Sequence, residues 1–320
     1  MGDENSAEKP EILAYSDSAI DRVVATLRAG EPVALPTETV YGLAANAAST
    51  DAVAAIYRAK GRPDFNPLIV HVPNSNAARC ITRFNAIAEE LAKAFWPGPL
   101  TMVLPLSHVG HDSVTPAVTA GLNTIALRCP AHRAMQNVLQ HSGLLLAAPS
   151  ANRSGAISPT SAAHVATSLG SRIGLILDDG PCSSGVESTI ISVCDAGWRI
   201  LRPGPITMAA IATLLNSDPL SDSTDKAITA PGQLASHYAP QKPLRLNVIE
   251  ATQEEWLIGF GEVAGDESLS PSGDLAEAAS RLYAALHRAD SGSGKAIAVA
   301  PVPETGIGVA INDRLRRAAA

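Results

Sequence analysis

Two segments near the N-terminus constrain the fold and the chemistry of this chain more than any other feature. The first, residues 36–43 (PTETVYGL), follows the short apolar run 33–35 and opens with a proline and a row of small hydroxyl side chains. The second, residues 60–67 (KGRPDFNP), places two cations and an amide on a loop restrained by proline and glycine, directly before the apolar run 68–72. Because such apolar runs predict strands, the cations and hydroxyls stand at strand ends. Their placement predicts a cleft that binds a polyanion.

The length and composition predict a globular protein of two domains. The 320 residues are enough for two units that each bury a core. A hydrophobic content of 46% with only 17% charged residues argues against disorder. The formal net charge of -7 argues against a protein that coats nucleic acid, because phosphate binding is driven by clustered Lys and Arg. A locally basic cleft remains compatible with this charge.

The cysteines and the N-terminus predict a soluble cytoplasmic protein. Cys80, Cys129, Cys182 and Cys194 form no CxxC pair and lack metal-finger spacing, so we expect reduced, mostly buried thiols. Residues 1–10 are polar and acidic, unlike a signal or transit peptide. No apolar run approaches the roughly 20 residues that a membrane-spanning helix needs.

Strand-like apolar runs alternate with helical patterns through the first two-thirds of the chain. Strands are predicted over 32–36, 68–72, 100–106, 124–128, 144–148, 173–177, 188–193 and 199–201, and helices over 18–29, 51–59, 85–94, 132–141, 161–168 and 208–215. Thr50 and Thr207 stand where helix N-caps belong. Because the strands do not alternate one for one with helices, we expect an α/β fold with a mixed, twisted sheet.

A change in composition divides the chain. Residues 216–230 are rich in Ser, Asp and Thr, which is typical of a linker. Strands over 244–249, 256–260 and 296–299 and helices over 275–288 and 309–318 then predict a small Rossmann-like α/β unit. We therefore place a first domain at 1–216, a linker at 217–240 and an accessory domain at 241–320.

If the cleft binds a nucleotide, side chains must hold its phosphates. The chain has no GxxxxGK[ST] motif and no GxGxxG at a strand–helix junction, and the similar segment 292–295 (GSGK) reads as a turn. Lys60 supplies a point charge and Arg62 a fork of donors that suits phosphate oxygens. The alternative is that both cations lie at a solvated helix end, where they complement the helix dipole.

Several other polar residues also have two interpretations. Arg128 closes an apolar strand, so it needs a partner, which is either a structural carboxylate or an anionic ligand. Ser150 and Ser158 stand where hydroxyls either cap helices or help to bind anions. Glu38 and Glu187 show no visible partner for acid–base catalysis. The adjacent acids 178–179 are interpreted as solvated turn residues rather than metal ligands.

Further motifs complete a family resemblance. They are residues 96–101 (WPGPLT), 127–130 (LRCP), 148–152 (APSAN), 185–189 (GVEST) and 201–205 (LRPGP). Together with the two opening segments they resemble the YrdC-like family, and more narrowly the L-threonylcarbamoyladenylate synthases in their long, two-domain form. The motifs occur in the family's order over roughly residues 15–215. Residues 306–308 (GIG) and 312–315 (NDRL) resemble the family's accessory domain.

The resemblance implies a fold, a reaction and partners. The fold is a YrdC-like mixed sheet with an open cleft. The reaction is that of a nucleotidyltransferase, which joins L-threonine, bicarbonate (or CO2) and ATP, with Mg2+, into threonylcarbamoyl-AMP and releases pyrophosphate. The product would pass to a downstream tRNA threonylcarbamoyl transferase that makes threonylcarbamoyladenosine (t6A). Contact with tRNA would be possible but not required.

The resemblance also implies roles for individual residues. ATP would be contacted by Arg62, Asn66, Thr124, Ser150, Ser158, Arg202 and Tyr238. L-Threonine would be contacted by Thr39, His71, Arg128, Ala148 and Ser188. Lys60 and Arg62 are the candidate catalytic residues, while metal ligands and a general base stay unassigned. Tyr238 would fold back over the nucleotide, or it would only anchor the chain. The linker and the accessory domain would act as a lid.

Two other functions are compatible with parts of the pattern. The first is an RNA-binding module, which would hold RNA in the same cationic cleft. The acidic net charge and the small number of large aromatic side chains, four Phe and three Trp, weigh against extended base stacking. A carbamoyl transferase of the hydrogenase-maturation type shares the first domain. Such proteins carry zinc-finger and acylphosphatase portions, for which this chain has neither the CxxC motifs nor the length.

Overall fold

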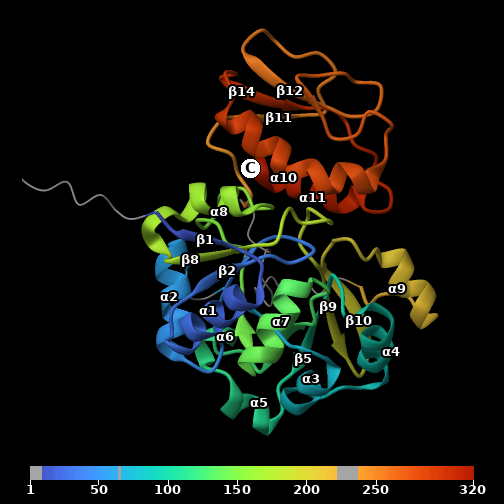
Figure 1. Ribbon diagram of the computed structural model, residues 1–320. Coiled ribbons are helices and arrows are strands. Elements are labelled where there is room, and N and C mark those ends of the chain that lie inside the picture. Colours follow the sequence, from blue (N-terminus) through green and yellow to red (C-terminus); the bar gives the residue numbers. More distant parts are fainter. Residues whose placement is uncertain (1–8, 64–65, 222–236) are drawn as a thin grey trace, which may run out of the picture.

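The computed structural model describes residues 9–63, 66–221 and 237–320, and these build two sheets with their helices. A large lower body holds a ten-stranded sheet, and a smaller upper body holds a four-stranded sheet (Figure 1). Helices α10 (Leu275–Ser291) and α11 (Gly308–Ala318) lie on the side of the smaller sheet that faces the larger body (Figure 1). The predicted linker 217–240 falls largely on residues 222–236, which lie outside the described residues.

The larger sheet is mixed, as predicted. Its strands are β1 (Glu11–Ala14), β2 (Val33–Leu35), β3 (Gly42–Asn46), β4 (Ile69–His71), β5 (Leu100–Pro105), β6 (Thr124–Arg128), β7 (Leu146–Ala147), β8 (Leu175–Asp178), β9 (Thr189–Cys194) and β10 (Gly197–Arg202). Their spatial order is β1-β8-β2-β3-β7-β4-β6-β5-β9-β10. Strand β6 pairs in parallel with β4 but antiparallel with β5, and β9 pairs in parallel with β5 but antiparallel with β10.

Helices cover this sheet, and every α-helix among them except α6 begins at a residue whose side chain accepts a capping hydrogen bond. They are α1 (Asp17–Arg28), α2 (Thr50–Lys60), α3 (Ser75–Ile81), α4 (Ala86–Phe95), α5 (His108–Ser113), α6 (Pro116–Thr119), α7 (Arg133–Ser142), α8 (Ala162–Leu169) and α9 (Met208–Leu215), with the short turn η1 (Gly170–Arg172). In α1 the core-facing side chains, Ile20, Val23, Val24 and Leu27, repeat at helical spacing and are buried. Thr207 caps α9 as predicted, whereas Ser49, not Thr50, accepts the capping hydrogen bond of α2.

The smaller sheet is parallel, with the order β11-β14-β12-β13. Its strands are β11 (Leu244–Leu246), β12 (Glu255–Gly259), β13 (Glu267–Ser268) and β14 (Ala296–Val299). The sequence did not predict β1, β3, α3, α5, α6 or β13, because these segments are short or lack a clear apolar period. For β3, the run Gly42–Asn46 contains Leu43 as its one large apolar side chain, and it forms a strand between β2 and β7.

One hydrophobic cluster joins the two bodies. It contains the core of the smaller body, including Leu282 and Leu286 of α10, and also Val40, Ile157 and Val186 from the larger body. Val40 directly follows Thr39, and Val186 lies two positions before Ser188, and the sequence placed both of these residues in the cleft. Because burial of apolar side chains stabilises their contact, the two bodies are packed on each other at this cleft.

Two expectations about the chain as a whole receive different answers. The cysteines are free, but only Cys129 and Cys182 are buried while Cys80 and Cys194 are exposed, so the prediction of mostly buried thiols holds for half of them. Within the described parts of the chain, none of the helices is both long and apolar enough to span a bilayer.

Candidate functional site

One row of paired residues carries several predicted site residues across the larger sheet. His71 on β4 pairs in register with Arg128 on β6, and Arg128 pairs with Thr101 on β5. Thr101 in turn pairs with Ile190 on β9, which pairs with Arg202 on β10. Because residues that share a register row point to the same face of a sheet, the side chains of His71, Arg128 and Arg202 lie on one face. The sheet therefore gathers residues that are far apart in the sequence.

These side chains line a cavity at the junction with the smaller body. The lining also includes residues of the loops around β3, β7 and β9 and of the C-terminal end of the predicted linker. Its members are Thr37, Thr39, Val40, Gly42, Arg62, Ile69, His71, Arg128, Ala148, Pro149, Ser150, Glu187, Ser188, Arg202, His237 and Tyr238. The cavity volume is about 50 Å³, which is room for a few water molecules. The predicted open cleft is thus narrow in this structure.

Arg128 has a buried carboxylate partner. Its Nη2 lies 2.7 Å from Oε1 of Glu38, and its Nη1 donates a hydrogen bond to Oγ1 of Thr39 at 2.8 Å. Burial raises the pKa of Glu38, but the Arg128 guanidinium outweighs this effect and holds that pKa below its usual range. The ion pair that the sequence left open therefore exists. Arg128 also lines the cavity, so its other predicted role as an anion ligand remains compatible with its position.

Arg202 is held by backbone and hydroxyl oxygens of Ser188. Its Nη2 donates to the Ser188 carbonyl at 2.9 Å and to the Ser188 hydroxyl at 3.2 Å. That hydroxyl also shares a 2.7 Å hydrogen bond with the hydroxyl of Thr101. The Arg202 side chain is buried at the cavity, and burial lowers its pKa. A buried guanidinium whose partners are neutral oxygens is suited to bind an anion.

Arg62 is a second buried cation without an acidic partner. Its Nη2 donates to the carbonyls of Asn66 and Pro67 at 3.4 and 3.2 Å, and its Nε has no hydrogen-bond partner among the described residues. Burial lowers the pKa of Arg62 to about 10, so the guanidinium still carries its charge at neutral pH. Within the described ranges, neither Arg62 nor Arg202 has a carboxylate within ion-pair distance. The cavity therefore holds positive charge in excess.

Lys60 is buried behind the cavity and does not line it. Its Nζ donates to the carbonyl oxygens of Ser150 at 2.5 Å and Asn152 at 2.6 Å. Burial, with a smaller effect of Arg62, lowers the pKa of Lys60 well below its usual value. In this position Lys60 ties α2 to the loop that places Ser150 in the cavity wall.

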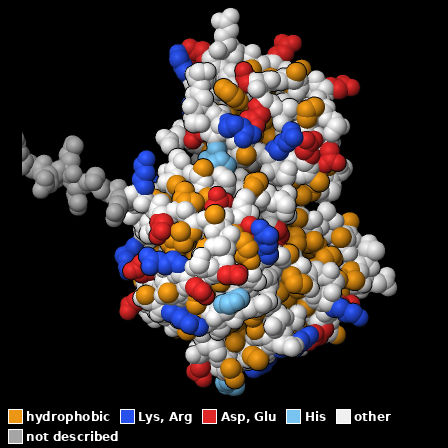
Figure 2. Space-filling model, viewed as in Figure 1, with side chains coloured by type: hydrophobic (Ala, Val, Ile, Leu, Met, Phe, Trp, Pro, Cys, Tyr) orange, Lys and Arg blue, Asp and Glu red, His pale blue; other side chains and the backbone are white. Residues whose placement is uncertain are grey.

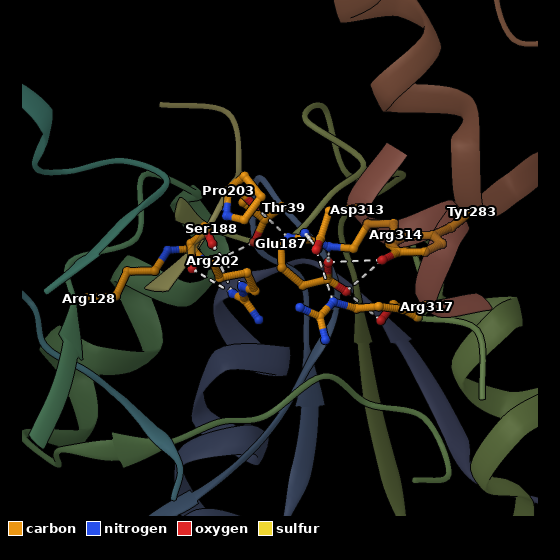
Figure 3. Close-up of polar contacts among 11 residues, drawn as sticks. Thr39, Arg128, Glu187, Ser188, Arg202, Pro203, Tyr283, Asp313, Arg314 and Arg317 are labelled. Atoms are coloured by element: carbon orange, nitrogen blue, oxygen red, sulfur yellow. Dashed lines mark hydrogen bonds and ion pairs between the residues drawn. The ribbon is translucent and has the colours of Figure 1, made fainter. Parts of the chain in front are cut away.

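Glu187 is the centre of a cluster that involves both bodies (Figure 3). Its Oε1 accepts a hydrogen bond from the Ser158 hydroxyl at 2.6 Å, and its Oε2 accepts from Tyr283 of α10 at 2.9 Å. Nε of Arg314, on α11, lies 2.7 Å from the same Oε2. Burial opposes ionisation, but the charges of Arg314 and Arg202 lower the pKa of Glu187 to about 2. The carboxylate is therefore ionised, and sequence reasoning had given it no partner.

Family models match both parts of the chain. Residues 25–204 match Sua5_yciO_yrdC, described as "Telomere recombination", and residues 206–320 match "Threonylcarbamoyl-AMP synthase, C-terminal domain". A Bacillus subtilis (strain 168) protein named threonylcarbamoyl-AMP synthase is 41% identical to the chain over 96% of its residues and 94% of the relative. The chain belongs to the threonylcarbamoyl-AMP synthase family.

A family member from Pyrococcus abyssi (strain GE5 / Orsay) is 38% identical and covers 91% of both chains. The solved structure named "Crystal structure of P. abyssi Sua5 complexed with L-threonine" has a TM-score of 0.87 and 35% identity, and covers 97% of each chain. This likeness confirms the predicted fold class, and the matches to the synthase family confirm the resemblance drawn from the motifs.

The cavity brings together most of the residues that the family resemblance placed in the site. Those that line it are Thr39, Arg62, His71, Arg128, Ala148, Ser150, Ser188, Arg202 and Tyr238. Four others do not line it: Lys60 and Ser158 donate their hydrogen bonds elsewhere, Asn66 is fully buried, and Thr124 starts the strand that Arg128 ends. The roles of all these residues stay predictions.

The C-terminal end of the predicted linker, residues 237 and 238, lies at the cavity. Tyr238 is buried, its ring lies 4.1 Å from that of His237, and its centroid is 5.4 Å from the guanidinium carbon of Arg314. Tyr238 therefore lies at the cavity and is also anchored in the cluster that joins the two bodies, so both interpretations of this residue have support. Burial lowers the pKa values of His71 and His237 to about 3 each, so both rings are neutral at pH 7.

The sequence missed several residues of this site. Glu38 and Glu187 were interpreted as lone acids, and Tyr283, Arg314 and His237 were given no role. Arg314 lies in the quoted segment 312–315, which resembles the family, so a signal was present. Its contact with Glu187 spans 127 positions, which no local pattern predicts.

The described residues contain no group of three or more His, Cys, Asp or Glu side chains placed to hold a metal ion. Asp179 pairs with Arg133 on the surface, and Asp178 accepts a hydrogen bond from Tyr41, so the interpretation of these acids as solvated was wrong in detail. Both acids are engaged as partners of other side chains, Asp179 of Arg133 and Asp178 of Tyr41.

Proposed function

We propose that this chain is a threonylcarbamoyl-AMP synthase, which forms threonylcarbamoyl-AMP and pyrophosphate from L-threonine, bicarbonate and ATP. The observation that carries the proposal is the buried cavity in which Arg62 and Arg202 have no acidic partner among the described residues, while Arg128, three strands away from Arg202, is paired with Glu38 and Thr39. The unpaired guanidinium groups of Arg62 and Arg202 suit a triphosphate. The end of the cavity at Arg128, whose charge is paired with Glu38, suits an amino acid. Membership of the synthase family over nearly the whole chain supports this reading.

The positive charge of the cavity supplies the main catalytic effect in this proposal. In phosphoryl chemistry, the protein acts chiefly by positioning the groups and by stabilising charge on the phosphate oxygens. Arg62 and Arg202 would bind these oxygens, and Ser150 would add a hydroxyl donor. Because Lys60 lies behind the wall, it would act by holding the Ser150 loop rather than by touching ATP.

The amino-acid end of the cavity would hold L-threonine. Arg128 and Thr39 offer donors to its carboxylate, and the neutral ring of His71, buried beside Arg128, offers an acceptor. The threonine nitrogen adds to the carbon of bicarbonate and water leaves, which gives a carbamate. A carbamate oxygen then attacks the α-phosphorus, and the bond from this phosphorus to the bridging oxygen breaks as pyrophosphate leaves.

Mg2+ fits this scheme as part of the nucleotide substrate. The two carboxylates that lie at or beside the cavity, Glu38 and Glu187, are engaged by Arg128 and Arg314. Mg2+ keeps several waters and commonly binds through substrate phosphates, so we propose that it enters as MgATP. It would neutralise the charge on the departing phosphates.

ATP does not fit a cavity of about 50 Å³. We therefore propose that His237 and Tyr238 move when the nucleotide binds, which extends the predicted role of the linker and accessory domain as a lid. The product would pass to a tRNA threonylcarbamoyl transferase.

The test is pyrophosphate release by the purified full-length chain in the presence of MgATP, L-threonine and bicarbonate. We expect release to require all three, and mass spectrometry to detect threonylcarbamoyl-AMP. Release that continues without threonine or without bicarbonate would overturn the proposal.

The RNA-binding alternative has a distinct outcome in a filter-binding assay. Tight tRNA binding with steep salt dependence and no nucleotide turnover would favour it. Figure 2 offers no support on the face it shows, where Lys and Arg side chains are interspersed with Asp and Glu.

A further inference from the structure

Arg314 is a fully buried cation that reaches from the smaller body to the edge of the cavity. Its side chain is 0% exposed, although it belongs to α11, which has no residue in the cavity lining. Its Nε lies 2.7 Å from Glu187, its Nη2 donates to the carbonyl of Pro203 at 2.9 Å, and its Nη1 lies 2.6 Å from Asp313. Arg314 thus contacts the neighbours of two site residues, since Glu187 precedes Ser188 and Pro203 follows Arg202.

Glu187 lies between two arginines that compete for it. In Figure 3, Arg202 lies on one side of its carboxylate and Arg314 on the other. Both Glu187 oxygens are taken by Arg314, Tyr283 and Ser158. Arg202 forms no ion pair with Glu187 within 4.0 Å and instead donates to the neutral oxygens of Ser188. The guanidinium of Arg202 therefore lies at the cavity without a carboxylate partner among the described residues.

The backbone segments that carry Glu187 and Arg202 lie close together. Whether the two side chains form an ion pair therefore depends on which other partners each of them has. A Cβ on Gly204 would lie 2.4 Å from the Thr189 nitrogen and 2.7 Å from the Glu187 carbonyl oxygen, so the two loops touch directly. On the other side, a Cβ on Gly185 would lie 2.3 Å from the Ala279 carbonyl of α10. The loop that carries Glu187 is therefore packed between the strand end at Arg202 and the helices of the smaller body.

We propose that Arg314 is a positioning residue for the site: it binds Glu187 and so prevents this carboxylate from pairing with Arg202, which leaves the Arg202 guanidinium available to a phosphate of ATP. The inference rests on the proposed function, because it takes ATP as the anion in the cavity. Without the Arg314 charge, Glu187 remains a buried carboxylate, and Arg202 is the other cation whose charge acts on it. Pairing between them would neutralise one of the two unpaired cations that line the cavity.

The experiment measures ATP binding by isothermal titration calorimetry with the full-length chain. Arg314→Gln should weaken ATP binding by about tenfold or more, because a charge-assisted contact of Arg202 is lost. The double variant Glu187→Gln with Arg314→Gln should recover affinity to within about threefold of the unaltered chain, since it has no carboxylate that captures Arg202. Arg316→Gln is the matched control: it removes the same charge from α11 at an exposed ion pair with Glu304 and should leave ATP affinity unchanged.

Recovery in the double variant separates positioning from a structural role. If Arg314 only holds the two bodies together, replacing Glu187 as well should weaken that contact further and should not restore ATP affinity. An Arg314→Gln chain that is folded by circular dichroism and binds ATP normally would overturn the inference. So would a folded double variant that binds ATP as weakly as Arg314→Gln.

Arg314→Gln leaves a buried carboxylate without its cation, which can prevent folding. In that case Arg314→Lys replaces it, because it keeps a charge near Glu187 but loses the fork that also reaches Pro203. Because the retained charge still holds Glu187, Arg314→Lys should bind ATP to within about threefold of the unaltered chain. A larger loss that adding Glu187→Gln reverses would also support the inference, and a larger loss that this second change does not reverse would overturn it. Failure of the unaltered chain to bind ATP would instead refute the proposed function.

Discussion

Substitution of Lys60 by methionine tests whether this residue is catalytic or holds a loop. Methionine keeps a long unbranched side chain but removes both hydrogen bonds of the Nζ, which join it to the carbonyls of Ser150 and Asn152 at 2.5 and 2.6 Å. A buried carbonyl that loses its donor costs about 1–3 kcal/mol. The two together cost about 2–6 kcal/mol, and relief of the buried ammonium's desolvation offsets part of this.

We therefore expect Lys60→Met to lower the free energy of unfolding by about 2–4 kcal/mol. For a chain of this size the melting temperature should fall by roughly 5–15 °C, since each kcal/mol corresponds to about 2–4 °C. The assay is thermal and urea unfolding followed by circular dichroism. Because Ser150 lies in the cavity wall, the KM for ATP should rise more than kcat falls in the proposed reaction.

Lys295→Met is the matched control. Lys295 is exposed and pairs with Glu254 on the surface, so its loss should change stability by less than about 1 kcal/mol. If Lys60→Met melts with the unaltered chain and lowers kcat without changing KM, the loop-holding role is wrong and the sequence-based prediction of a catalytic lysine is right.

Three further perturbations have expected outcomes. The pKa of His71 and of His237 is about 6.5 in the unfolded chain but about 3 in the folded chain. Between these two values the unfolded chain binds more protons than the folded chain. Each His should therefore lower the free energy of unfolding by up to about 1.4 kcal/mol per pH unit as the pH falls from about 6 to 4. Urea unfolding at pH 7, 6 and 5 measures this, and equal stability at all three would contradict it. Gly185→Ala should destabilise the chain by about 1–3 kcal/mol more than Gly143→Ala, because both positions have positive φ but only Gly185 meets a neighbouring backbone; equal melting temperatures would contradict the close packing on α10. Arg202→Gln should weaken ATP binding by about 10- to 100-fold while Arg199→Gln on the same strand should not; calorimetry that finds equal affinities would remove Arg202 from the nucleotide site.

Truncation after Asn216 should reduce turnover because it removes the proposed lid, and the structure adds a second cause. The apolar side chains of Val40, Ile157 and Val186 pack in the same cluster as the core of the smaller body. Truncation exposes them to water as well as removing the lid, so the single substitutions above are the sharper tests.

The sequence alone determined which segments become the main strands and helices. Apolar runs such as 124–128 and capped periodic segments such as 208–215 matched the structure at their predicted ends, because local periodicity and caps act within a few residues. The motifs likewise named most residues of the cavity wall, since they record the chemistry needed at each strand end.

Only the tertiary structure decided which charges meet. The register of five strands placed His71, Arg128 and Arg202 on one face, and the docking of α11 supplied Arg314 to Glu187 across 127 positions. The same packing removed Lys60 from the cavity wall and gave Glu38 a partner. Ion pairs and burial depend on distances in the folded chain, and residues far apart in sequence acquire these distances only when the sheet forms and the second body packs against it.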